Sequence, residues 1–450
     1  MVRVETFPAP ELGNASFLVA DTDRGVALVV DPFRDVDGYI RRADDLGVRI
    51  THALDTHLHN DFVSGRRELE SAAGTQIDDL APDHDMTLGA VTVRAIHTPG
   101  HTPDHKSYVL YEDGRPRALF SGGAVMVGGV ARTDLFGPHL AAHLGLEMLQ
   151  TLQVRLRGLP DDIAVYPTHG SGSFCGTAGG SGHETTLGRE RKTNPYLLTT
   201  EVMPFLARIL DQHRFPDYYR DMAAVNSNGA PLLGRSPAQP PALTADDVAA
   251  HMEAGAAVVD VRSGRDYDGA HIPGSYSVPV DAGSFSAWVG WLVPRDRDIV
   301  LAGGTPAQLE DATRQLRRIG FDRVVGVLDG GIEAWEASGR GISRFETATI
   351  EDMARWILDG EEMTVVDARD DHEWGAGHAP GSIHMYVPDI RHHAQDIPKS
   401  KPVAVHCASG HRAGIAASLL EQAGLTRVIH VNGNYSDWHR LHLAEVHPHE

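Results

Sequence analysis

The stretch "THLHNDFVSG" (residues 56–65) places His57, His59 and Asp61 at alternate positions. It follows "ITHALDT" (50–56), whose composition predicts a β-strand that runs into a histidine-rich loop. A loop that leaves a buried strand is a rigid support for ligands, and imidazole and carboxylate groups both bind divalent metals. The stretch therefore predicts a metal site.

Two later stretches carry similar residues where a predicted strand ends. They supply His101 and His105 in "TPGHTPDH" (98–105), and His169 and Cys175 in "PTHGSGSFCG" (167–176). One loop histidine alone is usually only solvated, whereas this repeated arrangement on three loops favours convergence on a shared metal. Cys175 follows His169 by six residues, so we expect it near the metal or its entrance.

The segments around these loops alternate between strand and helix patterns. "NASFLVADTDRGVALVVDP" (14–32) predicts a hairpin around a "DTDRG" turn, and "VDGYIRRADDLG" (36–47) predicts a helix that ends at glycine. Further strands are predicted in "AVTVRAIHTPGH" (90–101) and "HKSYVLYEDGRPRALFSGG" (105–123). This order favours two sheets with helices outside them.

The last 200 or so residues contain an internal repeat. "VVDVRSGRDYDGAHIPGS" (258–275) matches "VVDARDDHEWGAGHAPGS" (365–382) at an offset of 107. Short apolar strands alternate with helical patterns in both copies, which predicts parallel sheets covered by helices. The Pro- and Gly-rich stretch 226–244 is the expected linker, and we predict domains at 1–238, 239–343 and 344–450.

The second copy contains "PVAVHCASGHRAGIAASLL" (402–420), a strand, a short loop and an alanine-rich helix. Main-chain amides at a helix N-terminus stabilise a thiolate, and a nearby arginine adds positive charge for an anionic substrate. Cys407 is therefore the expected nucleophile for sulfane sulfur and Arg412 its anion-binding partner. The loop between them consists of Ala408, Ser409, Gly410 and His411.

The first copy lacks these two residues. In "VLAGGTPAQLEDA" (300–312), Gly303 stands opposite Cys407 and Gln308 opposite Arg412. Asp260, Arg262 and Gly274 are kept, and they serve the scaffold. We therefore expect a structural or docking domain without a nucleophile.

Composition excludes several partners. Forty Lys and Arg against 61 Asp and Glu give a net charge of −21, which argues against nucleic acid or an anionic membrane surface. No secretory leader pattern and no run of about 18 apolar residues is present. The two cysteines lie in different predicted domains, so a structural disulfide is not expected and the predicted location is the cytoplasm.

The motifs "THLHND", "TPGHT" and "PTHG" resemble those of the metallo-β-lactamase superfamily. "TPGHTPDH", "GGVARTDL" and "PTHGSGSFCG" resemble persulfide dioxygenases fused to rhodanese domains, and the Cys407 loop resembles the active loop of rhodaneses. The resemblance implies an αββα metal domain followed by two rhodanese-like α/β domains. It also implies a homo-oligomer.

The resemblance implies one ferrous iron, held in such dioxygenases by two histidines and an aspartate. His57 and His101 match the two histidines, whereas Gly123 stands at the position of the aspartate. Phe62 replaces a histidine of the superfamily motif, which weakens a second metal position. Asp61, His59 or His169 would complete the ligand set, and zinc is the alternative metal.

Three functions follow as hypotheses. The first is oxidation of a low-molecular-weight thiol persulfide to sulfite, coupled to sulfur transfer between persulfide, thiosulfate and sulfite through Cys407. In it, His105 would orient a ligand histidine, and Cys175 would meet a persulfide sulfur unless it is merely a buried small residue. The second is a zinc-dependent (thio)ester hydrolase, and the third is a sulfur carrier with a degenerate metal domain.

Overall fold

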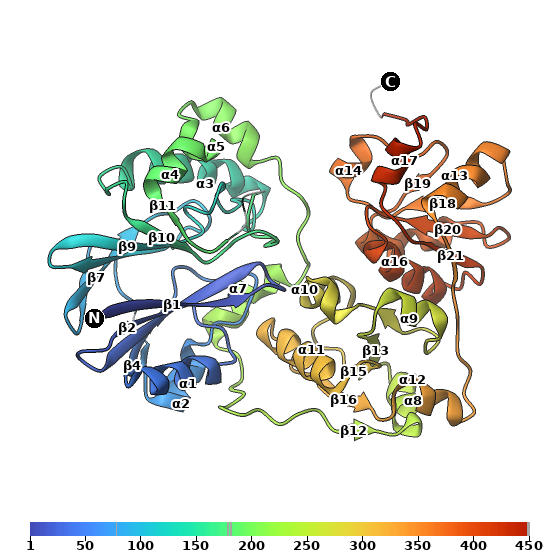
Figure 1. Ribbon diagram of the computed structural model, residues 1–450, viewed down its shortest axis with the longest axis horizontal. Coiled ribbons are helices and arrows are strands. Elements are labelled where there is room, and N and C mark those ends of the chain that lie inside the picture. Colours follow the sequence, from blue (N-terminus) through green and yellow to red (C-terminus); the bar gives the residue numbers. More distant parts are fainter. Residues whose placement is uncertain (78, 178–179, 181, 448–450) are drawn as a thin grey trace. The chain divides into compact units, whose positions relative to one another are not determined.

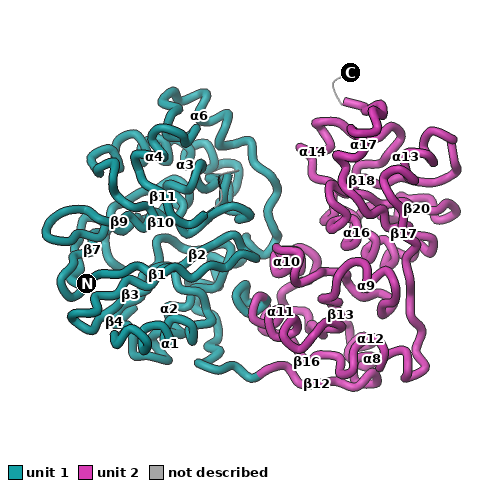
Figure 2. Tube along the Cα trace, viewed as in Figure 1, with its two compact units in different colours: residues 1–238, 316–320 teal, residues 239–315, 321–450 magenta. Residues whose placement is uncertain are grey.

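The computed structural model describes residues 1–77, 79–177, 180 and 182–447. The chain divides into two compact units (Figure 2). The first comprises Met1–Ala238 with Leu316–Gly320, and the second comprises Gln239–Gln315 with Phe321–Glu450. Within the described ranges, no helix has both the length and the apolar character that crossing a membrane requires.

The first unit contains two mixed sheets (Figure 1). The first sheet has the strand order β1 (Val2–Ala9), β2 (Asn14–Asp21), β3 (Val26–Val30), β4 (Arg49–Leu54) and β5 (Gln76–Ile77). The second has the order β11 (Thr185–Thr186), β10 (Ala164–Pro167), β9 (Arg115–Gly122), β8 (Lys106–Glu112), β7 (Val91–His97) and β6 (Asp85–Leu88). The predicted hairpin at 14–32 is confirmed as β2 and β3.

An apolar core lies between the two sheets. Phe17 and Leu28 from the first sheet pack in one cluster with Tyr108 and Phe120 from the second, and all four are buried. A second cluster lies between the other face of the second sheet and its helices, where Val109 and Leu119 meet residues of α3 and α6. Helices therefore flank a pair of packed sheets, and the predicted αββα sandwich is confirmed.

The helices of the first unit have the following bounds: α1 (Asp37–Leu46), α2 (Arg66–Ala73), α3 (Pro138–Gln150) with η1 (Thr151–Arg155), α4 (Leu187–Thr193), α5 (Pro195–Leu198), α6 (Val202–Ile209) and α7 (Tyr219–Asn228). The predicted end of α1 is confirmed, because Gly47 adopts φ 68° and donates its N–H to the last carbonyls. The predicted linker is too long at its start, since α7 continues to Asn228.

The second unit contains two five-stranded sheets whose strands all pair in parallel. One has the order β12 (Ala242–Leu243), β16 (Val324–Leu328), β15 (Ile299–Ala302), β13 (Ala257–Asp260) and β14 (Tyr276–Ser277). The other has the order β17 (Glu346–Ala348), β21 (Val428–Val431), β20 (Val403–His406), β18 (Thr364–Asp367) and β19 (Ile383–His384). The internal repeat is thus a repeated fold.

The helices of the first copy are α8 (Ala245–Glu253), α9 (Gly264–Gly269), η2 (Val280–Ala282), α10 (Phe285–Leu292), α11 (Pro306–Arg318) and α12 (Gly331–Ala337). Those of the second are α13 (Ile350–Asp359), α14 (Asp371–Gly375), η3 (Val387–Asp389), α15 (Ile390–His393), η4 (Ala394–Asp396), α16 (His411–Gln422) and α17 (Ser436–Arg440). The first helix of each copy starts with the same Thr–Asp capping box. The first helices of the two copies are therefore capped in the same way.

Candidate metal centre and cysteine loop

The predicted histidines converge in the first unit. His57 follows β4, His101 follows β7 and His169 follows β10, so three strands deliver them to one place. Their ring centroids lie 4.8 to 5.3 Å apart, and none of the three residues is more than 2% exposed. Buried histidines at this spacing need partners or a cation.

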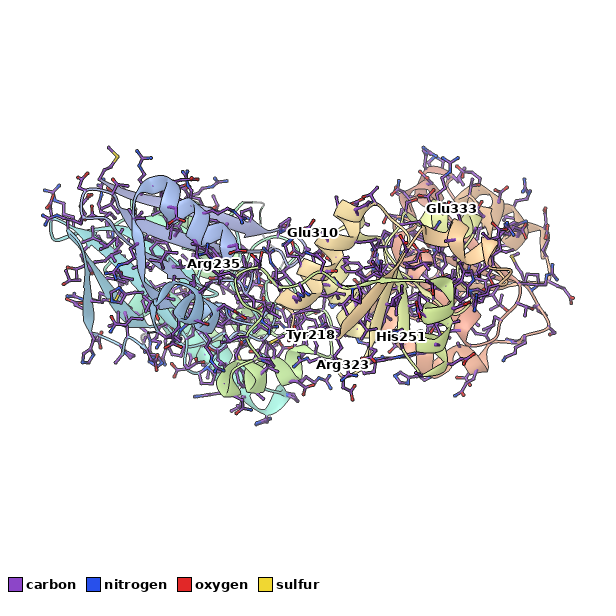
Figure 3. The ribbon with its side chains drawn as sticks, turned by 90° about the horizontal axis from the view of Figure 1, so that it is seen from below. Tyr218, Arg235, His251, Glu310, Arg323 and Glu333 are labelled. Atoms are coloured by element: carbon purple, nitrogen blue, oxygen red, sulfur yellow. The ribbon has the colours of Figure 1, made fainter. Side chains whose placement is uncertain are left out.

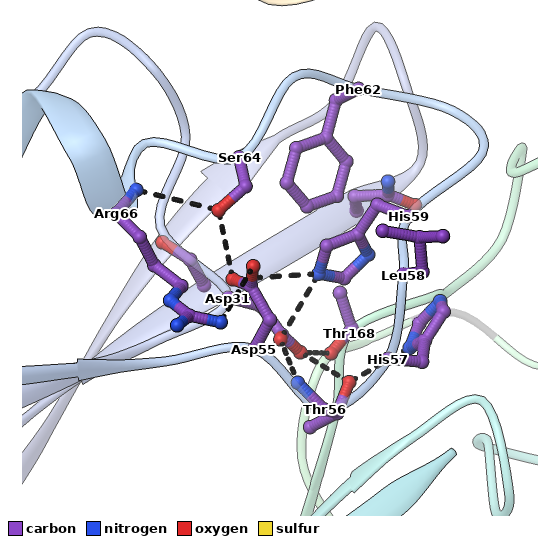
Figure 4. Close-up of polar contacts among 12 residues, drawn as sticks. Asp31, Asp55, Thr56, His57, Leu58, His59, Phe62, Ser64, Arg66 and Thr168 are labelled. Atoms are coloured by element: carbon purple, nitrogen blue, oxygen red, sulfur yellow. Dashed lines mark hydrogen bonds and ion pairs between the residues drawn. The ribbon is translucent and has the colours of Figure 1, made fainter. Parts of the chain in front are cut away.

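Hydrogen bonds assign the protonated nitrogen of each ring. Thr56 Oγ1 donates to Asp31 Oδ2 (2.9 Å), so it accepts from His57 Nδ1 (2.9 Å; Figure 4). His101 Nδ1 donates to the Arg132 carbonyl at 2.7 Å. Each ring therefore carries its proton on Nδ1 and keeps a lone pair on Nε2.

His169 follows the same rule. Asn14 gives its amide N–H to Asp61 Oδ2 (2.6 Å), so its carbonyl oxygen accepts from His169 Nδ1 (3.1 Å). The Nε2 atoms of His169 and His57 face each other at 3.3 Å. Two nitrogens about 2.0–2.1 Å from one tetrahedral zinc ion lie about 3.3–3.4 Å apart. Two lone pairs at this distance repel without a cation between them, so the residues fit a metal ion.

His59 lies beside this group with one nitrogen unused. Its Nε2 bonds Asp31 Oδ1 at 3.1 Å, while its Nδ1 is buried with no hydrogen-bond partner among the described residues (Figure 4). Burial works to lower the pKa of His59, but the Asp31 carboxylate outweighs it and raises the pKa to about 9. His59 is within 4.8 Å of His57 and His169, measured between ligand atoms.

Asp61 lies behind His169. Its Oδ2 is 3.3 Å from His169 Nδ1, and Tyr218, labelled in Figure 3, donates its hydroxyl to the Asp61 main-chain carbonyl at 2.9 Å. Burial acts to raise the pKa of Asp61, but the attraction of His169 dominates and lowers it. The carboxylate is therefore an anion that orients His169, and its Oδ1 has no hydrogen-bond partner within the described part of the chain.

His105 has neither ring nitrogen open. Its Nδ1 lies 2.8 Å from Thr98 Oγ1, and its Nε2 accepts from the Gly123 N–H at 2.9 Å. The ring stacks on His57 with centroids 5.0 Å apart. Burial and the neighbouring imidazoles keep the pKa of both His57 and His105 well below its ordinary value, so both rings are neutral. His105 thus packs against a candidate ligand.

Two positions differ from the superfamily motif, and the structure gives each a packing reason. Phe62 is fully buried, stacks on His59 with centroids 4.2 Å apart and meets Phe33 edge-on. At Gly123, a Cβ atom would lie 2.6 Å from Ala131 Cβ and 2.9 Å from His101 Cδ2. The Phe62 ring therefore occupies one expected ligand position, and the side chains of Ala131 and His101 fill the space beside Gly123 at the other.

Cys175 is fully buried beside the histidines. Its Sγ and one nitrogen each of His101 and His169 lie within 4.8 Å of one another. Burial raises the pKa of the Cys175 thiol well above its ordinary value, and the Asp61 carboxylate adds to this effect. The thiol lies inside the cluster and is not exposed at an entrance.

Sequence reasoning missed two residues of this site. Asp31 is fully buried and binds Thr56, Thr168 and His59. Asn14, also buried, holds His169 and Asp61 together. The only signal for Asp31 was a carboxylate at the end of the apolar run "VALVV" (26–30), and Asn14 offered none.

The Cys407 loop has the predicted form in the second unit. Cys407 is 1% exposed, and its Sγ accepts from the Gly410 N–H (3.1 Å) and the Ala413 N–H (3.3 Å). Gly410 adopts φ 86°, a left-handed conformation that glycine adopts without strain. The loop and the first turn of the helix thus direct the N–H groups of Gly410 and Ala413 towards the sulfur.

Arg412 forms an ion pair with Glu373. It forms two bonds to Glu373, at 2.5 and 2.8 Å, so its guanidinium is fixed in a bidentate pair. Although burial opposes it, Arg412 lowers the pKa of Glu373 to about 2. Burial, together with Arg412 and His430, lowers the pKa of His411 to about 4. Of these side chains next to Cys407, Arg412 supplies the positive charge and His411 is neutral.

In the first copy, another side chain fills the place of the nucleophile. Gly303 adopts φ 68°, and a Cβ there would lie 2.6 Å from the Cδ and Nε of Arg262. Asp260 fixes Arg262 through bonds of 2.6 to 3.2 Å. A cavity of about 670 Å³ is lined by Gly303 and by Ser409, Gly410 and His411 of the Cys407 loop, together with Glu333, labelled in Figure 3.

Comparison with known proteins matches both halves of the chain. Residues 244–338 and 349–441 each match the rhodanese-like domain family. A hydroxyacylglutathione hydrolase of Synechococcus sp. is 32% identical over 186 residues, which are 37% of this chain and 68% of that protein. Human mitochondrial persulfide dioxygenase ETHE1 is 27% identical over 197 residues, which are 40% of this chain and 70% of that protein.

Solved structures agree with this arrangement. A metallo-β-lactamase from Staphylococcus aureus subsp. aureus COL is 30% identical, with a TM-score of 0.65, and the match covers 72% of this chain and 98% of that one. The match extends well beyond the 238 residues before the first β-strand of the repeats, so it includes part of the repeated region.

Proposed function

Because the chain belongs to the metallo-β-lactamase superfamily and carries two rhodanese-like domains, we propose that it is a metal-dependent enzyme of sulfur metabolism. It oxidises a low-molecular-weight thiol persulfide with O2 and water, which yields the thiol and sulfite. It also moves sulfane sulfur through a persulfide on Cys407. Two observations support this proposal. The Nε2 lone pairs of His57 and His169 face each other, and the same chain contains Cys407, whose sulfur accepts a main-chain N–H.

His57 and His101, together with His169 or His59, would hold one ion. When bound, iron would bring the persulfide sulfur and O2 together and would let electrons pass from the sulfur, which is oxidised, to O2, which is reduced. Thr56, the Arg132 carbonyl and Asn14 fix the ring protons on Nδ1, so that the Nε2 lone pairs point into the site. The burial of all three rings excludes bulk water.

The Cys407 thiolate attacks the outer sulfur of thiosulfate, a sulfur–sulfur bond forms on Cys407, and sulfite leaves with the electron pair of the broken bond. Gly410 and Ala413 stabilise the thiolate before the attack. Arg412, whose charge Glu373 balances, offers its remaining N–H groups to the substrate and the leaving sulfite. A small thiol or sulfite then takes the sulfur and restores the thiolate.

Hydrolysis of a thioester by a zinc ion is the second candidate. It is favoured by the absent carboxylate at Gly123 and by the similarity to hydroxyacylglutathione hydrolases. Oxygen-activating iron is usually bound by two histidines and a carboxylate, whereas zinc is also bound by histidines alone. The substrate would then be a thiol ester and not a persulfide.

The test compares two variants after anaerobic purification. Wild type loaded with ferrous iron should consume O2 when given glutathione persulfide, and it should transfer sulfur from thiosulfate to cyanide. His101→Ala should lose only the O2 uptake, and Cys407→Ser only the transfer. His143→Ala, which removes an exposed histidine of α3, should change neither activity.

Other outcomes would overturn the proposal. Bound zinc with thioesterase turnover and no O2 uptake would establish the hydrolase. Sulfur transfer alone, insensitive to His101→Ala and without any bound metal, would reduce the chain to a sulfur carrier with an inactive metal domain.

A further inference from the structure

The Cys175 thiol has a fixed place inside the imidazole cluster. Its residue is fully buried, and its Sγ belongs to the group formed with His101 and His169 within 4.8 Å. The Nε2 of His101 is equally buried and has no hydrogen-bond partner in the described ranges. A buried nitrogen lone pair without a partner, next to a buried thiol, indicates that both groups bind the same metal ion.

One residue holds both donors in position. The Arg132 N–H donates to the Cys175 carbonyl at 2.8 Å, and the Arg132 carbonyl accepts from His101 Nδ1 at 2.7 Å. The Cys175 N–H also bonds Ser173 Oγ at 3.2 Å. The main chain of Arg132 therefore contacts both residues, and these hydrogen bonds fix the positions of Cys175 and His101 relative to each other. Such supporting bonds orient the ligands of metal sites.

The expected carboxylate has no room at its usual position. The direction of a side chain at Gly123 is blocked by Ala131 and by the ring of His101, with 2.6 and 2.9 Å to the nearest atoms. Asp61 uses its Oδ2 for Asn14 and His169, while its buried Oδ1 has no hydrogen-bond partner among the described residues. The cluster therefore offers nitrogen donors and one sulfur, but no carboxylate at the superfamily position.

We propose that Cys175 is a thiolate ligand of the metal ion, with His101 and His169, in place of the carboxylate absent at Gly123. The inference rests on the proposed function only in so far as that function requires a bound metal. On binding, the sulfur–hydrogen bond breaks, the proton leaves to solvent and a metal–sulfur bond forms, without any change of oxidation state. The metal domain thus uses a softer ligand set than two histidines and a carboxylate.

X-ray absorption of the zinc-loaded full-length protein tests this directly. One sulfur at about 2.3 Å should accompany nitrogen neighbours at about 2.0–2.1 Å. The cobalt-loaded protein should show a sulfur-to-cobalt charge-transfer band in the near ultraviolet. Both signals should vanish in Cys175→Ser. They should persist in Cys407→Ser, which removes the other cysteine of the chain.

The outcomes separate this inference from the proposed function. Metal bound at one equivalent with nitrogen and oxygen neighbours alone overturns the thiolate ligand and leaves the proposed activity standing. No bound metal overturns both. A sulfur signal that disappears in Cys407→Ser and not in Cys175→Ser would mean that the metal binds Cys407. That result also overturns the inference. Because the chain has only these two cysteines, a sulfur signal that persists in Cys407→Ser assigns the ligand to Cys175 even if Cys175→Ser folds poorly.

Discussion

Gly123 explains how a site can lose a ligand and remain packed. The space next to it is filled by Ala131 and His101, which approach the position of a Cβ to 2.6 and 2.9 Å. Its N–H is also used, because it donates to His105 Nε2. A carboxylate cannot be added here without moving His101, which is itself a candidate ligand.

We therefore expect Gly123→Asp to lower metal content and not to raise it. Overpacking should destabilise the fold by roughly 1–3 kcal/mol and displace the His101 ring. Metal analysis and chemical denaturation measure the two effects. Gly158→Asp is the matched control, since a Cβ at Gly158 meets no atom within 4 Å. Higher metal content in Gly123→Asp would contradict the packing argument.

Glu373 gives a pH-dependent contribution to stability. Its pKa falls from 4.5 unfolded to about 2 in the folded protein, mainly through Arg412 against the opposing effect of burial. The contribution is therefore complete above pH 4.5 and is lost as the pH falls towards 2. Glu373→Gln should lose stability at neutral pH and lie closer to wild type in acid.

Denaturant titrations at a series of pH values measure this convergence. Glu361→Gln, at an exposed glutamate of the same domain, is the control and should follow wild type throughout. A stability gap between Glu373→Gln and wild type that stays constant down to strong acid would show that the ion pair with Arg412 does not form in solution.

The element that defines the sulfur site is the turn before α16. Gly410 is the residue before this helix, and its left-handed backbone lets its N–H and that of Ala413 point at Cys407. The same helix ends near Gly424, which adopts φ 84°. One helix therefore has a glycine with a left-handed backbone close to each end, but only Gly410 donates a hydrogen bond to the Cys407 sulfur.

Gly410→Ala should cost about 1–2 kcal/mol of stability from backbone strain and also reduce sulfurtransferase turnover. Gly424→Ala is a close control, because φ differs by two degrees and the nearest atom to a Cβ is 3.1 Å away in both cases. It should be destabilised similarly and keep its turnover. Equal loss of turnover in both variants would mean that stability alone is responsible.

At the level of the whole chain, one fold is used twice with one nucleophile. Both copies have the same strand order, and both keep an aspartate–arginine pair after the strand that starts the motif: Asp260–Arg262 and Asp367–Arg369. In the first copy Arg262 reaches the space under Gly303. The absence of a cysteine is therefore accompanied by a filled site.

Restoring the two missing residues should not restore activity. Gly303→Cys with Gln308→Arg, made in a Cys407→Ser background, should remain without thiosulfate:cyanide sulfurtransferase activity, because Arg262 blocks the Cβ of residue 303. The same two changes with Cys407 intact should leave the transfer activity in place. Activity that returns in the Cys407→Ser background would show that Arg262 moves aside.

Local patterns were sufficient for the fold and for which histidines converge. The apolar run of "NASFLVAD", whose residues are all buried, and the repeated "VVD" strands indicate the sheets, and His57, His101 and His169 each follow a strand of the first unit. Asn14 and Asp31 were not predictable, since they act through partners as far as 155 residues away. The Glu373–Arg412 pair was missed for the same reason, because it joins α14 and α16 across 39 residues of sequence.

Only 1% of Cys407 is exposed, which restricts the kinds of molecule that can react with its sulfur. A bulky protein reductase cannot bring its own cysteine within bonding distance unless the backbone from Ala408 to Arg412 opens. If Cys407 carries a sulfane sulfur, as proposed, its enclosure would protect that sulfur from the cysteines of other proteins.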